Sequence, residues 1–138
     1  FKDATADWGF DTPAVSHGIA LADLDNDGDL DVVVNNLNQE AFAWRNTATA
    51  PRIAVRLAGN PPNTDGIGAR ITVHSGRLPA QSQEVIAGGR YLSSDQPGRT
   101  FAADPDGESH TIEVRWPNGR MRRILNPADN QYHRAEHP

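Results

Sequence analysis

Residues 19–34 read Ile-Ala-Leu-Ala-Asp-Leu-Asp-Asn-Asp-Gly-Asp-Leu-Asp-Val-Val-Val, and this stretch decides how the first third of the chain folds. Apolar runs stand on both sides of an acidic loop, and the second run holds three consecutive valines, 32–34. β-branched residues favour strands, because their side chains lose conformational freedom in a helix. The stretch therefore predicts two strands joined by an acidic loop.

The acidic loop has the residue types and the spacing of a calcium site. Calcium takes six to eight oxygen ligands at about 2.3–2.6 Å, and carboxylates at loop positions one, three and five can converge on one ion. Glycine at position six, here Gly28, permits the sharp turn that this convergence needs. Position seven usually offers its backbone carbonyl, and a carboxylate at position nine can close the shell. The predicted ligands of Ca²⁺ are Asp23, Asp25, Asp27, the carbonyl of Asp29, and Asp31.

Two other interpretations of the loop fit less well. An EF-hand needs a glutamate at position twelve and helices on both sides, whereas Val34 stands at position twelve and the flanks are strand-like. A solvated acidic turn without metal would place five carboxylates within nine residues, where they repel one another. Magnesium is less suited than calcium, because it prefers small octahedral sites that retain water.

Short strand-like runs continue along the rest of the chain, and Gly, Pro, Asn and Asp punctuate the gaps between them. Arg52–Leu57 (RIAVRL) alternates between polar and apolar residues, as a half-buried strand does. No stretch has a helical apolar stripe. The pattern predicts an all-β protein, with an antiparallel β-sandwich or barrel-like domain in the larger part. The expected strands are Ile19–Ala22, Asp31–Val34, Ala41–Arg45, Arg52–Leu57, Ala69–His74, Glu84–Ala87, Thr111–Trp116 and Met121–Leu125.

Composition excludes several classes of protein. The 138 residues include no cysteine, so disulfide scaffolds, thiolate metal sites and cysteine nucleophiles are excluded. The net charge of −5 disfavours general nucleic-acid binding, which needs a basic face. No apolar run approaches the roughly 20 residues of a membrane-spanning helix. Because the sequence begins with Phe1, we expect a processed chain or a fragment.

Charge divides the chain into two parts. Residues 1–46 contain nine acidic and two basic residues, whereas residues 47–138 contain nine acidic and eleven basic residues. A short run of small residues that ends in Pro51 lies between the acidic first part and the second part. We therefore expect a calcium-binding repeat over 1–46, a linker over 47–51 and a β domain over 52–138.

The first part resembles an FG-GAP (VCBS-type) repeat. The resemblance rests on His17–Asp31 (HGIALADLDNDGDLD), with Phe1–Phe10 (FKDATADWGF) similar to the segment that leads into such repeats. It implies one blade-like β-hairpin repeat of a propeller type, whose calcium loop joins two strands. Carried over to this sequence, it implies the same five metal-binding aspartates.

The second part resembles an ASPIC/UnbV domain over roughly 52–126. The matching stretches are Asn63–Arg70 (NTDGIGAR), Glu84–Ser93 (EVIAGGRYLS) and Val114–Arg120 (VRWPNGR). One departure is Phe101–Gly107 (FAADPDG), which replaces a Phe-Gly-Leu-Gly-like turn of the family. The family, which includes cartilage acidic protein and bacterial secreted relatives, is extracellular, and it offers no established catalytic residues.

Three arrangements could indicate catalysis or a further metal. Ser16-His17 and Ser109-His110 place hydroxyl and imidazole groups side by side, but strand neighbours point to opposite faces. His133 and His137 could hold a transition metal only on a helix, and a solvated tail is the favoured interpretation. Asp104–Glu108 (DPDGE) lacks calcium-loop spacing, and a plain turn is favoured over a second cation site.

These features together predict a secreted, non-enzymatic calcium-binding β module for structural assembly or adhesion. A self-assembling surface or fibre subunit is a variant, because an unclosed sheet leaves edge strands that can pair with another copy. The expected partners are an extracellular protein or glycan, with no nucleic acid and no membrane span. The alternative is a carbohydrate-binding accessory module of a secreted multidomain protein, whose candidate platforms are Trp8, Trp44, Tyr91, Trp116 and Tyr132.

Overall fold

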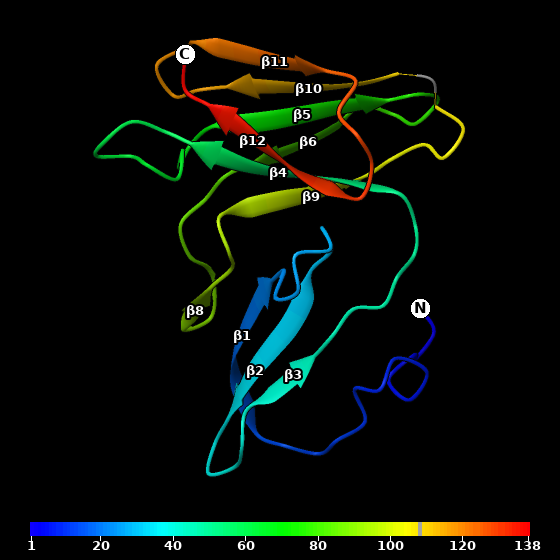
Figure 1. Cartoon of the computed structure of the whole chain (residues 1–138). Helices are drawn as coiled ribbons and strands as arrows, with labels where there is room; N and C mark the ends of the chain where they lie inside the picture. The colour runs from blue at the N-terminus through cyan, green and yellow to red at the C-terminus, as the bar shows by residue number, and fades with distance from the viewer. Residues whose placement is uncertain (108) are drawn as a thin grey trace.

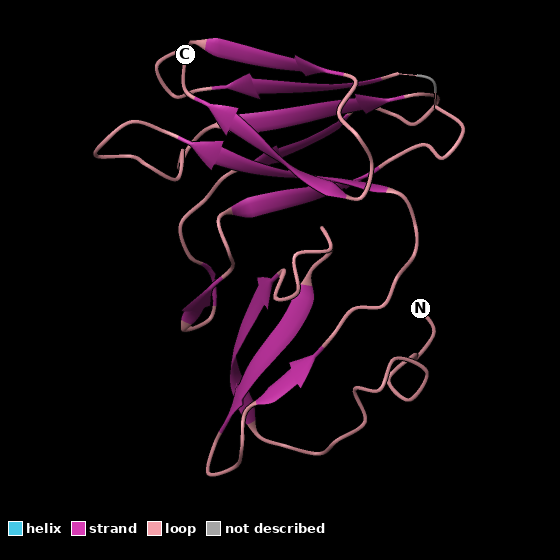
Figure 2. Ribbon diagram, viewed as in Figure 1, coloured by secondary structure: helices cyan, strands magenta, loops and turns pink. Residues whose placement is uncertain are grey.

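A computed structural model describes residues 1–107 and 109–138. Within this part every regular element is a strand, and none is a helix (Figure 2). The prediction of an all-β protein is therefore confirmed. Nowhere in the described residues does a helix occur that is long and apolar enough to cross a membrane.

Three strands of the first part form an antiparallel sheet in the order β1-β2-β3 (Figure 1). Their bounds are Ser16–Ala22 for β1, Asp31–Asn36 for β2 and Phe42–Trp44 for β3. The acidic loop joins β1 to β2. Ala22 and Asp31, the residues on either side of it, form the last pair of the ladder. The predicted hairpin around the loop is thus present, and β3 extends it to a meander.

The second part is a sandwich of two sheets, in the orders β12-β4-β9 and β11-β10-β5-β6 (Figure 1). The bounds are β4 Arg52–Ala58, β5 Arg70–Ser75, β6 Gln81–Glu84, β9 Gly98–Ala102, β10 His110–Arg115, β11 Met121–Leu125 and β12 Gln131–Glu136. A two-stranded ribbon, β7 (Gly89–Arg90) and β8 (Ser93–Ser94), projects toward β1.

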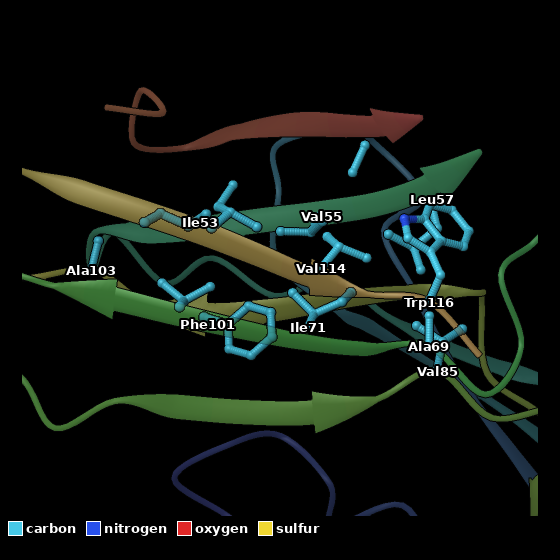
Figure 3. Close-up of a cluster of buried hydrophobic side chains, with 13 residues drawn as sticks. Ile53, Val55, Leu57, Ala69, Ile71, Val85, Phe101, Ala103, Val114 and Trp116 are labelled. Carbon is cyan, nitrogen blue, oxygen red and sulfur yellow. The ribbon is translucent and has the colours of Figure 1, made fainter. Parts of the chain in front are cut away.

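The hydrophobic core lies between these two sheets (Figure 3). Alternation in β4 turns Ile53, Val55 and Leu57 inward, where they meet apolar side chains of the opposite sheet and the ring of Phe101 from β9. Every member of the core cluster comes from residues 53–135. Burial of apolar surface therefore stabilises the sandwich, and the meander β1–β3 lies outside this core.

The meander is attached to the sandwich by polar contacts. Among described residues 1–46, all the buried ones other than Gly28 are Asp or Asn: Asp23, Asp29, Asp31 and Asn36. The outer edge of β1 is covered by the segment before β9, because the Leu21 N–H donates to Asp95 Oδ1 at 2.9 Å and the Gln96 N–H donates to the Leu21 carbonyl at 2.9 Å.

The strands differ from the expectations at several places. The strand expected at Glu84–Ala87 lies at Gln81–Glu84, where polar side chains suit an edge strand: Gln81 and Gln83 hydrogen-bond the backbone of β9. The strand Gly98–Ala102 was not expected. The C-terminal segment that was interpreted as a solvated tail forms β12, which pairs in parallel with β4 although an antiparallel sandwich was predicted.

Truncating Phe101 tests the location of the core. Phe101 is almost completely buried between the sheets, so Phe101→Ala should lower the free energy of unfolding by about 3–5 kcal/mol. Met121 is mostly exposed on β11, and Met121→Ala should change it by no more than about 0.5 kcal/mol. Urea denaturation followed by tryptophan fluorescence measures both values. Equal effects of the two substitutions would contradict this assignment of the core.

Candidate metal centre

The acidic loop curls because two of its residues adopt left-handed backbone conformations. Asn26 has φ of 63° and Gly28 has φ of 91°. Asparagine and glycine are the residues that tolerate this region best. The loop tip therefore folds back over the outer face of the sheet β12-β4-β9, where the Thr100 hydroxyl of β9 donates to the Gly28 carbonyl at 3.2 Å.

Three of the five predicted ligands come together at this loop. One carboxylate oxygen each from Asp23, Asp25 and Asp27 lies within 4.8 Å of the other two. Two oxygens bound to one calcium ion at about 2.3–2.6 Å can be at most about 5 Å apart. The three side chains are thus close enough to share one ion, and their hard oxygen donors are the type that calcium prefers.

Backbone hydrogen bonds hold these carboxylates in place. Asp23 is buried, and its two oxygens accept the N–H groups of Asp27 at 3.2 Å and Gly28 at 2.8 Å. Asp27 Oδ1 accepts the N–H of Asp29 at 3.0 Å. This last bond is the main reason that the pKa of Asp27 is lowered, with the nearby Arg52 adding to the effect. Both carboxylates are therefore oriented by the loop itself.

The carboxylates of Asp29 and Asp31 point elsewhere. Asp31 is buried at the base of the loop, where its oxygens accept the N–H groups of Leu24 at 2.8 Å and Asn46 at 2.7 Å. Asp29 is only 4% exposed, and neither of its oxygens accepts a hydrogen bond from a described residue. Burial, reinforced by the charge of Asp27, raises the pKa of Asp29 to about 6. Ligation by the Asp29 carbonyl and by Asp31 stays a prediction.

Arg52, the first residue of β4, inserts its guanidinium into the acidic loop. Its Nη2 lies 3.1 Å from Asp27 Oδ1 and 3.5 Å from Asp29 Oδ2, and it donates to the Asp27 carbonyl at 3.0 Å. Its Nη1 donates to the Ala48 carbonyl at 2.8 Å. The side chain is only 11% exposed. Sequence reasoning missed this residue, since nothing local in the sequence connects residue 52 with a loop 25 residues earlier.

A second contact joins the sandwich to the loop beside Asp23. The Asp23 N–H donates to Gln96 Oε1 at 3.2 Å, and Gln96 Nε2 donates to the Tyr132 hydroxyl at 3.2 Å. Burial, followed by the charge of Asp23, raises the pKa of Tyr132. The loop therefore approaches all three strands of the sheet β12-β4-β9. Arg52 belongs to β4, Thr100 to β9 and Tyr132 to β12.

The acidic turn beginning at Asp104 is engaged by an arginine. Asp104 is buried and its carboxylate accepts the Arg77 backbone N–H at 2.8 Å and the Arg77 side chain at 3.1 Å, while Asp106 also contacts Arg77 at 2.8 Å. These hydrogen bonds hold the pKa of Asp104 well below its ordinary range. Glu108, the last member of this candidate site, lies outside the described residues. The arrangement favours the plain turn.

A serine, a histidine and an aspartate meet at one end of the sandwich. His110 Nδ1 lies 2.8 Å from Ser75 Oγ, and His110 Nε2 lies 3.4 Å from Asp129 Oδ1. The order of groups resembles a nucleophile–base–acid array. Ser75 is only 2% exposed, however, and its Oγ also accepts the Asp104 N–H at 2.8 Å. The Ser75 hydroxyl is therefore enclosed by the protein, and the contacts of this cluster tie β5, β10 and two loops together.

Fold and site together define an all-β protein in which a sandwich packs against an acidic, oxygen-rich loop. The family described as ASPIC and UnbV matches residues 59–138, which is more than half of the chain. The chain belongs to this family. The matched range begins directly after β4 and includes every later strand. A search among curated proteins gave no match.

The buried position of Arg52 predicts a large stability effect. Arg52→Met should lower the free energy of unfolding by about 3 kcal/mol or more, because it leaves the buried carboxylate of Asp29 and the partly buried one of Asp27 without their cation. Arg45 also pairs with the loop, at 2.6 Å from Asp25 Oδ2, but it is 69% exposed. Arg45→Met should therefore cost no more than about 1 kcal/mol.

Urea denaturation in the presence of chelator measures both variants without any contribution from calcium. A smaller loss for Arg52→Met than for Arg45→Met would show that the guanidinium of Arg52 does not stabilise the loop.

Proposed function

We propose that this chain is a non-enzymatic, extracellular calcium-binding β module used for structural assembly or adhesion. The observation that supports it best is the convergence of the Asp23, Asp25 and Asp27 carboxylates in one hydrogen-bonded loop. The resemblance of residues 1–46 to an FG-GAP repeat supports the same metal. Secretion is proposed because proteins of the ASPIC/UnbV family, to which this chain belongs, are extracellular.

Calcium would be held by the three convergent aspartates, with the Asp29 carbonyl and Asp31 as the remaining ligands of the proposal. The ion supplies two positive charges to a loop in which only two arginines approach the carboxylates among the described residues. Weak affinity is sufficient outside cells, since extracellular calcium modules work with dissociation constants of about 10⁻⁴–10⁻³ M. Binding to the folded state alone stabilises that state by mass action.

The meander offers a surface for assembly. The register places Ile19, Val34 and Phe42 on one face of its sheet, together with Leu21, Val32 and Trp44. Ile19 is exposed and the other five are only partly buried, although Phe10 of the N-terminal segment packs edge-on against Trp44 with ring centroids 4.9 Å apart. In the described chain no strand pairs with the outer edge of β3. An apolar face beside an open edge is suited to pairing with a second copy.

A carbohydrate-binding accessory module is the second candidate. Of its proposed aromatic platforms, Trp116 is buried in the core and is unsuitable. Trp8, by contrast, is 73% exposed and lines a cleft of about 630 Å³ together with Phe10 and Trp44. Exposed aromatic rings beside a cleft are able to stack on sugars, and this observation favours keeping the candidate.

Thermal unfolding tests the metal. The melting temperature of the parent chain should rise with calcium, and rise little with magnesium or chelator. The variant Asp25→Asn, Asp27→Asn should melt at the same temperature in all three conditions, because it removes two of the three convergent carboxylates. Asp7→Asn is the matched control, since Asp7 is an exposed aspartate that pairs only with Lys2 among the described residues. A parent chain indifferent to calcium would contradict the proposal.

Light scattering after size-exclusion chromatography tests assembly. The parent chain should form oligomers whose population rises with protein concentration. Ala43→Lys in β3 should reduce them, because a charge on an edge strand discourages pairing with another strand. Ala50→Lys in the exposed connection before β4 is the control. A parent chain that is monomeric at every concentration, with and without calcium, would remove self-assembly from the proposal.

A further inference from the structure

A cleft of about 770 Å³ opens on the outer face of the sheet β12-β4-β9, next to the acidic loop. Its lining includes Arg56 of β4, Tyr132 and Arg134 of β12, and the residues Asn26 and Asn130. Asn26 belongs to the acidic loop, so the cleft lies beside the candidate metal centre. We call it the arginine cleft.

The two arginines stand directly opposite each other. β4 and β12 are neighbouring strands (Figure 1). They pair in parallel, and Arg56 is the register partner of Arg134. Side chains at partner positions share one face, and like charges placed there destabilise the sheet. Among the described residues, the guanidinium of Arg56 contacts the ring of Tyr132 and forms no ion pair with a carboxylate. Arg134 approaches only the exposed Glu136, at 3.9 Å. The lining therefore holds two arginines and one acidic residue, Asp65, and this excess of positive charge favours an anionic ligand.

Tyr132 holds one of the two guanidinium groups in position. The guanidinium carbon of Arg56 lies 4.6 Å from the centroid of the Tyr132 ring, which is a stacking distance for a cation over an aromatic face. The ring is itself fixed through its hydroxyl, which accepts Gln96 Nε2 at 3.2 Å. Stacking leaves the N–H groups at the edge of the guanidinium available. A planar fork with this arrangement matches a carboxylate.

The rest of the lining indicates what else the ligand bears. Asn26 offers an amide group that both donates and accepts hydrogen bonds, as sugar hydroxyls require, and Asn130, whose Oδ1 already accepts the Arg52 backbone N–H at 3.3 Å, can donate from its amide nitrogen. Asp65 also lines the cleft, and its carboxylate accepts hydroxyl hydrogens but repels a densely charged phosphate or sulfate ester. A sugar ring that bears one carboxylate beside several hydroxyls satisfies both requirements of this lining.

We propose that the arginine cleft binds a uronic-acid saccharide, whose carboxylate lies between Arg56 and Arg134 and whose hydroxyls meet the amides around them. The inference deepens the proposed function, on which it rests, by naming the class of extracellular partner. It differs from the aromatic platform of the second candidate, because charge rather than stacking selects the sugar.

Calorimetric titration with two tetrasaccharides of the same β-1,4 linkage tests the inference. One is tetraglucuronate and the other is cellotetraose, which has the same rings without carboxylates. The parent chain in calcium should bind tetraglucuronate at least about tenfold more tightly than cellotetraose. Arg56→Gln and Arg134→Gln should each weaken tetraglucuronate binding by about tenfold or more, as expected for the loss of hydrogen bonds to a charged group.

Two further variants separate specific recognition from general attraction. Arg56→Lys keeps the charge but loses the planar fork, and it should weaken binding nearly as much as Arg56→Gln. Arg122→Gln removes an exposed arginine of β11 outside the cleft and should leave binding unchanged. Equal weakening by Arg122→Gln and Arg56→Gln, or equal binding of the two sugars, would overturn the inference.

Comparing the sugar titration with the thermal unfolding in calcium and in chelator separates this inference from the calcium proposal. Failure of the parent chain to bind tetraglucuronate while its melting temperature still rises with calcium would overturn the arginine cleft alone. Binding that depends on Arg56 and Arg134, in a chain whose melting temperature ignores calcium, would support the cleft and remove the metal.

Discussion

Electrostatic repulsion within the acidic loop is the constraint on which the arrangement of the two parts depends. Five aspartates occupy nine residues, and three of them are buried. Buried carboxylates need hydrogen bonds or cations, because removing charge from water is costly. The loop meets part of this need with its own backbone N–H groups and part with Arg52 from β4. Neutralising the loop therefore also fixes the meander β1–β3 against the sandwich, at the point where the Asp27 carbonyl accepts the guanidinium.

The two parts are consequently stabilised by different forces. In the sandwich, side chains such as Ile53 and Phe101 are removed from water between two sheets (Figure 3). The meander has no comparable apolar core within the described chain, and it relies on polar contacts at its loop and along the edge of β1. Solution conditions that change the charge of the loop should act on the meander first. A calcium ion placed there would act at the junction of the two parts, where the role that we propose for it is structural.

Local sequence patterns predicted the features that are encoded over a few residues. Alternation in Arg52–Leu57 predicted β4, because apolar residues at every second position are turned into the core. The spacing of the loop aspartates predicted that the first three would converge. Gln131–Glu136 (QYHRAE) has no such alternation, and in the structure Ala135 is its one buried residue. Its pairing with β4 joins segments that are far apart in the chain. Arg52 was missed for the same reason. Its place in the loop follows from tertiary contacts that the sequence around it does not reveal.

Amide hydrogen exchange of residues 23–31, in calcium and in magnesium at equal concentration, tests the central claim most directly. The claim is that calcium orders this loop and thereby holds the two parts together. Calcium at ten times its dissociation constant should slow exchange of the Asp27 and Gly28 amides by about tenfold, because the loop must release the ion before it opens. The amide of Asp23, which donates to Gln96, should slow with them. Exchange that is equally fast in both ions would contradict the account.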